Sequence, residues 1–146
     1  MSFGESIAPL FGRLVLSWFY FTQAYRYTRD WNDTALILTM KSLPAAQVFL
    51  FIALMGIVLG GLSLLLGFRT RIGALALFAI TVTATIIMHD YWTLSTAAQR
   101  AADYDIFARN IAICGGLLAL IGLGGGRFGM DNVSAKPQGR GGPQRR

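Results

Sequence analysis

The sequence contains few of the residues that build metal and disulfide sites. Among its 146 residues there is one cysteine, Cys114, and one histidine, His89. A single cysteine excludes an intramolecular disulfide, a CxxC couple and a thiolate metal site, and a single histidine excludes bis-histidine haem ligation within one chain. We therefore expect no metal site and no redox cofactor in the chain itself, and contact with a quinone or a lipid stays open.

Charged residues are also scarce, at 14% of the chain, whereas hydrophobic residues make up 54% and the mean hydropathy is +0.52. A soluble chain of this length has room for one core, and long runs without charge need a solvent that tolerates apolar surface on every side. The net charge of +6 lies largely beside apolar segments and near the C-terminus, where topology and anionic lipid explain it without nucleic acid. The composition therefore favours an integral membrane protein.

Four apolar stretches are long enough for transmembrane helices, and they cover about residues 7–25, 45–67, 72–89 and 106–123. The four-residue turn 68–71 permits only a tight antiparallel hairpin between the second and third helices. We predict an all-α membrane protein, with an antiparallel four-transmembrane-helix bundle over residues 1–131. Residues 132–146 are predicted to be a disordered basic tail, because they cannot bury enough apolar area to offset their ordering entropy.

Basic residues indicate the orientation of this bundle. Arg69 and Arg71 lie in the second-to-third turn, and further basic residues follow the fourth stretch, on the same predicted side. The opposite loops mix arginine and lysine with aspartate, so the positive-inside rule places both termini in the cytoplasm. The first stretch lacks a small-residue cleavage pattern after its aromatic cluster, which favours a retained anchor over a signal peptide.

Polar residues within the stretches must face away from lipid. Thr81, Thr85 and His89 recur at i, i+4 and i+8 and form one stripe. The stripe could line a quinone head-group site or a proton path, but threonines bonded to their own helix and an interfacial His89 would give the same pattern. Asn110 needs a partner such as His89 or Thr85. Arg13 is expected to snorkel or to bond helix-end carbonyls, with a quinone or lipid phosphate as the alternative partner.

These residues define one candidate polar or ligand site. We expect His89, Asp90, Arg109 and Asn110 to lie close together at the outer ends of the third and fourth helices, since apolar surroundings favour partnered polar groups. Trp92, next to Tyr91, could cover a flat ring. The candidate site residues are His89, Asp90, Trp92, Arg109, Asn110 and Arg13. None is assigned as catalytic, and none as a metal ligand.

Small residues suggest where helices pack closely, either within the bundle or between chains. The candidate packing glycines are Gly56, Gly60, Gly61, Gly115 and Gly116. Leu64, on the same helix as the first three, is expected to face lipid.

Five short motifs, in this order along the chain, resemble the pattern of the DoxX family, which comprises small four-helix membrane proteins of bacteria and archaea. They are Gly12-Arg13-Leu14, Gly60-Gly61 with residues 64–71, residues 89–92, Asn110 with Gly115-Gly116, and residues 125–131. The chain departs from the family where many members carry a glutamate before the paired glycines, since residues 56–59 contain no acid. A lysine that many members carry after the first helix is also missing, with Arg26 and Arg29 as possible replacements.

The resemblance implies a bacterial plasma-membrane protein with several crossings. Members resemble subunits of thiosulfate-oxidising quinone reductases or other membrane oxidoreductase complexes, so we expect a non-catalytic accessory subunit of a respiratory or oxidoreductase complex. Its expected partners are the lipid bilayer and other subunits or further copies of itself, without nucleic acid. Two alternatives stay open, a quinone-binding enzyme subunit and a small-molecule transporter, although the buried ionisable groups and broken helices of transporters are not apparent.

Overall fold

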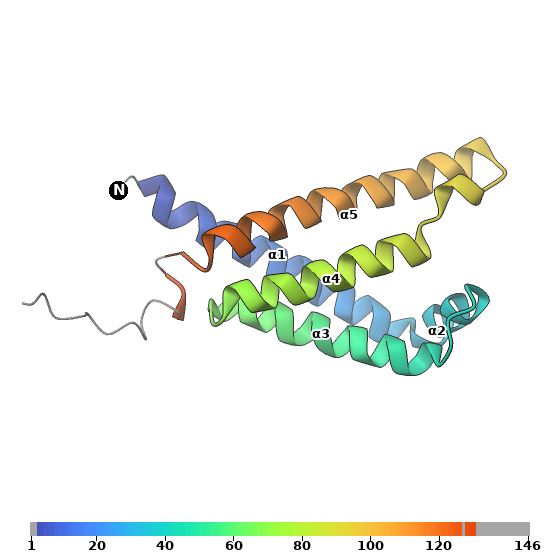
Figure 1. The fold of residues 1–146 in the computed structure, drawn as a ribbon, viewed down its shortest axis with the longest axis horizontal. Coiled ribbons are helices and arrows are strands. Elements are labelled where there is room, and N and C mark those ends of the chain that lie inside the picture. Colours follow the sequence, from blue (N-terminus) through green and yellow to red (C-terminus); the bar gives the residue numbers. More distant parts are fainter. Residues whose placement is uncertain (1–2, 127, 131–146) are drawn as a thin grey trace, which may run out of the picture.

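Five α-helices and one short 3-10 helix make up most of the computed structural model, which describes residues 3–126 and 128–130 (Figure 1). The elements are α1 (Phe3–Arg29), α2 (Trp31–Met40), α3 (Ala46–Leu66), α4 (Thr70–Met88), η1 (Tyr91–Thr93) and α5 (Ala97–Leu123). No strand occurs in this part of the chain, which confirms the all-α fold class. The predicted tail, 132–146, lies outside the described residues.

Two elements differ from the sequence prediction. Residues 26–44 were expected to form a loop, yet most of them fold into α2, which is too short to cross a membrane. Its buried residues, Thr34, Ala35 and Leu38, follow helical spacing and cover the start of α3. The fourth helix was expected to begin at Ile106, but α5 begins at Ala97 because the Thr96 hydroxyl caps its first turn by accepting from the Gln99 amide at 3.4 Å.

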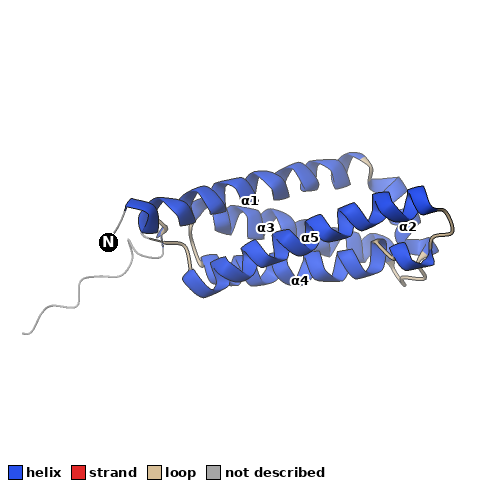
Figure 2. Cartoon of the chain, turned by 90° about the horizontal axis from the view of Figure 1, so that it is seen from above, coloured by secondary structure: helices blue, strands red, loops and turns tan. Residues whose placement is uncertain are grey.

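The turn between α3 and α4 has the predicted hairpin form. Gly67 ends α3 with a φ of 67°, in the left-handed region that glycine adopts without steric cost. The Phe68 amide then donates to the Ser63 carbonyl at 3.1 Å and closes the helix end. The chain reverses within a few residues, so α3 and α4 pack side by side and antiparallel (Figures 1 and 2).

The four long helices pack around one core as a bundle, in the order α1, α3, α4 and α5. The extensive contacts join α1 to α3, α3 to α4, and α4 to α5, whereas α1 and α5 share far fewer. The start of α1, the α3–α4 turn and the end of α5 lie at one end of the molecule, called here the turn end (Figure 1). The opposite end, called the His89 end, carries α2, η1 and the start of α5 (Figures 1 and 2).

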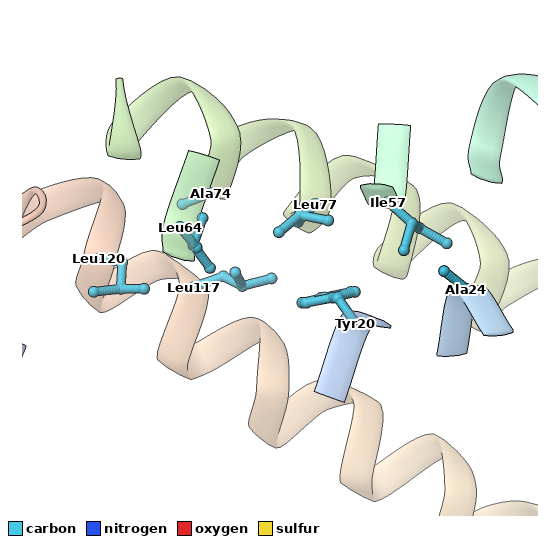
Figure 3. Close-up of a cluster of buried hydrophobic side chains, with 8 residues drawn as sticks. All are labelled: Tyr20, Ala24, Ile57, Leu64, Ala74, Leu77, Leu117 and Leu120. Atoms are coloured by element: carbon cyan, nitrogen blue, oxygen red, sulfur yellow. The ribbon is translucent and has the colours of Figure 1, made fainter. Parts of the chain in front are cut away.

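The main core fills the space between the four long helices. Its buried members are Tyr20, Ala24, Ile57, Leu64, Ala74, Leu77, Leu117 and Leu120 (Figure 3). Leu64 is fully buried, so its predicted lipid-facing position is wrong. The cause is that α3 is apolar on every face, and hydropathy then carries no information on which face points inward.

Three helical segments in the described chain are long and apolar enough to cross a membrane, namely Ala46–Leu66, Thr70–Thr93 and Ala97–Leu123. Large apolar side chains such as Ile52, Leu59 and Leu118 are exposed on them, as expected for contact with lipid. At 27 residues, α1 is about 40 Å long, which also suffices for a crossing. It is not among the three, because residues such as Arg13 and Gln23 reduce its apolarity, and its role as the fourth crossing stays a prediction.

The predicted packing glycines divide into two groups. A Cβ added to Gly56 would lie 2.4 Å from Ile80 Cδ1, and one added to Gly60 would lie 2.6 Å from Leu77 Cγ, so both face α4 closely. Gly61 faces Phe21 of α1 in the same way, at 3.3 Å. By contrast, a Cβ on Gly115 would meet nothing within 4 Å, and Gly116 is also exposed. Gly115 and Gly116 therefore do not lie at a tight contact within the chain, and a contact between chains stays a prediction.

Candidate functional site

The polar stripe on α4 points into the bundle, where Thr81 and Thr85 are buried. The Thr81 hydroxyl donates to the carbonyl of Leu77 at 2.7 Å. Because that uses its only proton, the Tyr20 hydroxyl of α1 must be the donor in the 2.7 Å bond between Tyr20 and Thr81. Tyr20 thereby joins α1 to α4 in the middle of the bundle.

The next two positions of the stripe are joined to α5. Asn110 Nδ2 donates to Thr85 Oγ1 at 3.0 Å, which is one of the partners expected from the sequence. His89 Nδ1 lies 2.7 Å from an oxygen of Asp103, and both side chains are about one-fifth exposed. Each polar group of the stripe therefore has a partner on another helix, and together these bonds fix the relative positions of three helices.

A cavity of about 260 Å³ lies beside this stripe and is lined by residues from all five α-helices. Much of its wall is apolar and comes from α3 and α4, including Leu50, Ile57 and Ile80. The polar lining consists of Tyr20, Gln23, Arg26, Tyr27, Asp30, Thr34, Thr81, His89, Arg109 and Asn110. Apolar walls with a few convergent polar groups are typical of small-molecule sites.

Two arginines, each from a different helix, line this cavity. Arg26 comes from the last turn of α1 and Arg109 from α5, and both are exposed. Both lie near Tyr27, close enough for their charges to act on its phenol. The two helices that carry these arginines, α1 and α5, share few contacts with each other.

The structure brings together part of the candidate site. His89, Arg109 and Asn110 line one cavity. Asp90 does not line it and forms an ion pair with Lys41, in the loop between α2 and α3. Trp92 is 57% exposed and also lies outside the cavity lining.

The aromatic residues of η1 pack away from the cavity. Tyr91 contacts Trp92, Tyr104 and Phe107 edge to face, at centroid distances of 5.2 to 5.4 Å. The positions of Tyr91 and Trp92 do not match the expectation that they cover a ring bound beside His89, because Tyr91 packs edge to face against Trp92 and against two rings of α5.

Arg13 lies at the turn end, far from the other candidates. It is 1% exposed, and its Nε donates to the Leu64 carbonyl at 2.9 Å, while Nη1 donates to the Gly125 carbonyl. Cβ atoms added to Gly67 and Gly129 would lie 2.7 Å and 3.2 Å from Nη1, so the guanidinium fills a niche lined by glycine. Its bonds to carbonyls at helix ends are those expected from the sequence.

Sequence reasoning missed the contribution of α1 to the cavity. Tyr20, Gln23 and Tyr27 follow one another at spacings of three and four, so they share a helix face. This spacing was the signal in the sequence that could have found them. In the described residues, no group of three or more His, Cys, Asp or Glu side chains could hold a metal ion.

Comparison with known proteins gives one match. The family model described as DoxX matches residues 8–90, which cover more than half of the chain, from α1 to the residue pair after α4. No curated protein and no solved structure matches the chain.

Proposed function

This chain belongs to the DoxX family of multi-pass membrane proteins, and from that premise we propose that it is a subunit of a membrane oxidoreductase or respiratory complex that binds a quinone. The observation that supports quinone binding is the cavity at the His89 end. Its volume suits the head group of a membrane-dissolved molecule, and donors such as Tyr27, Arg109 and Asn110 suit carbonyl oxygens on a flat ring. The apolar tail would leave the cavity between α1 and α5.

Filling the cavity tests this proposal. Ala84 of α4 lines it, whereas Ala79 of the same helix is exposed and does not. We expect the purified chain in mild detergent to bind a decyl-substituted naphthoquinone saturably, measured by quenching of tryptophan fluorescence. Ala84→Phe should weaken this binding at least about tenfold, and Ala79→Phe should leave it unchanged.

A variant on a second wall of the cavity provides a control in case Ala84→Phe misfolds. Ala53 of α3 also lines the cavity, so Ala53→Phe should weaken binding in the same way. If both filled variants keep their thermal unfolding temperature and still bind as the wild-type chain does, quinone does not occupy this cavity.

Membership of a complex is tested separately by purification of a tagged chain from bacterial membranes in digitonin. We expect a quinone-reactive oxidoreductase subunit to co-purify at a constant ratio. A chain that co-purifies only with itself, yet binds naphthoquinone, would contradict the subunit role and leave quinone binding in place.

The same proposal places the chain in the bacterial plasma membrane with both termini in the cytoplasm. In support, the start of α1, the end of α5 and the basic turn with Arg69 and Arg71 lie at one end of the molecule (Figure 1). A reporter fused after Arg146 should be active in the cytoplasm, and one inserted at the exposed Ser95 should be active outside. The reverse pattern would contradict this orientation.

A further inference from the structure

The two cavity arginines differ from most other cations of the described chain in having no partner there. Lys41 pairs with Asp90, Arg71 donates to the Gly122 carbonyl, and Arg100 donates to the Leu94 carbonyl. Arg26 and Arg109 make neither a hydrogen bond nor an ion pair with any described residue, although both line a cavity. Arg29 also lacks a partner among these residues, but it lies outside the cavity lining.

The lining of the cavity carries an excess of positive charge. Its one acidic member is Asp30, against the two guanidiniums of Arg26 and Arg109. The nearby carboxylate of Asp103 is bonded to His89. The other polar members, such as Gln23 and Asn110, are neutral, so nothing in the described lining balances the second arginine.

We propose that Arg26 and Arg109 bind an anionic oxygen on the head group of an amphiphile from two sides, with its chain lying between α1 and α5. This inference rests on the proposed function and deepens it, because it names an acidic ligand, such as a hydroxyquinone or a deprotonated quinol, instead of a neutral quinone. Alkyl carboxylates and phosphates share the same head-group chemistry, and the experiment below separates them.

The chemistry of the lining favours an oxygen anion over other ligands. A guanidinium offers several donors in a planar fork that suits oxygen anions, and hydrogen bonds to charged groups are stronger than neutral ones. The apolar walls from α3 and α4 exclude water on one side of the head group, which reduces screening there. Because both arginines are exposed, the solvent still screens part of the attraction, and we expect about a tenfold effect on affinity from each.

Two matched probes test the charge preference. One is 2-hydroxy-3-decyl-1,4-naphthoquinone, whose acidic hydroxyl makes it an anion at neutral pH, and the other is its neutral 2-methoxy analogue. Binding to the full chain in a non-ionic detergent is measured by tryptophan quenching. We expect the hydroxy probe to bind about tenfold more tightly than the methoxy probe, and high salt to reduce that difference.

Arginine variants then test which residues cause the difference in affinity between the two probes. Arg26→Gln and Arg109→Gln should each weaken binding of the hydroxy probe about tenfold and change binding of the methoxy probe by less than about twofold. Arg29→Gln removes an equal charge from the same end of α1, outside the cavity, and should change neither. All three positions are exposed, so these variants should keep the wild-type unfolding temperature.

The outcomes separate this inference from the proposed function. Equal binding of both probes, insensitive to Arg26→Gln and Arg109→Gln, would overturn the anion site and leave quinone binding standing. If neither naphthoquinone binds but decanoate or decyl phosphate binds with the same arginine dependence, the anion site is supported and the quinone role is overturned. If none of the four probes binds, both are overturned.

Discussion

The Nε atom of Arg13 lies 2.9 Å from the carbonyl oxygen of Leu64, although 51 positions separate the two residues in the sequence. The bond joins α1 to the last turn of α3, where helix carbonyls carry partial negative charge and lack a full set of helical partners. A second bond from Arg13 reaches Gly125, just beyond α5. A charged residue in a predicted membrane helix thus serves to connect three segments at the turn end.

Removing this cation should destabilise the bundle. In Arg13→Gln the buried carbonyl oxygens of Leu64 and Gly125 lose a charged donor, which costs about 2–3 kcal/mol. Unfolding of the purified chain in mixed detergent micelles measures the loss, with the exposed Arg29→Gln as the control. Equal stability of Arg13→Gln and the wild-type chain would show that these bonds do not hold the three segments.

Replacement of Gly67 and replacement of Gly115 by alanine should have opposite effects on stability. In Gly67→Ala the new Cβ would lie 2.6 Å from the Gly129 Cα, on a residue with a φ of 67°, so we expect a loss of about 2 kcal/mol or more. Gly115→Ala adds a methyl group in open space within a helix and should leave stability unchanged or raise it by up to about 1 kcal/mol. Thermal unfolding of both variants in detergent provides the comparison, and equal shifts would contradict the close approach at Gly67.

Adjacent leucines of α3 offer a test of the core. Leu64 is fully buried, whereas Leu65 is 40% exposed. Leu64→Ala leaves a cavity between the helices and should cost about 2–4 kcal/mol, while Leu65→Ala should change stability by less than about 1 kcal/mol. The free energy of unfolding in mixed micelles measures both. Similar losses for the two variants would indicate that α3 is rotated from the described position.

The Tyr20 hydroxyl should contribute modestly through its bond to Thr81. Tyr20→Phe removes the donor but leaves the Thr81 bond to Leu77, so we expect a loss of about 1 kcal/mol. A double-mutant cycle with Thr81→Ala isolates the interaction, and a coupling energy near zero would show that the bond adds no stability.

The sequence predicted the long helices and their hairpin because each depends on local patterns. A charge-free apolar run defines α3, and the short turn around Gly67 fixes its pairing with α4. The short helix α2 was missed because ten residues are too few for a membrane crossing, and its stability comes from burying Leu38 against α3, which no local pattern reports.

The candidate site was predictable only in part, for a related reason. Thr81, Thr85 and His89 share a helix face, and Asn110 required a polar partner, so their convergence followed from periodicity and from the cost of polar groups in lipid. Whether Asp90 would turn inward or pair with Lys41 depended on where the loop after α2 runs. The spatial order of the helices, which brings residues of α1 and α5 to one cavity, is a tertiary property that no local pattern contains.

The position of Gly125 also affects how the chain is made. A ribosome synthesises α1 and α3 long before it reaches Gly125, so until then the Arg13 guanidinium can bond Leu64 but lacks the Gly125 acceptor. Synthesis of Gly125 provides that acceptor and joins α1 to the end of α5. A product truncated before Gly125 retains the buried charge of Arg13 without this acceptor, so it should be less stable than the longer chain and be degraded faster by membrane proteases.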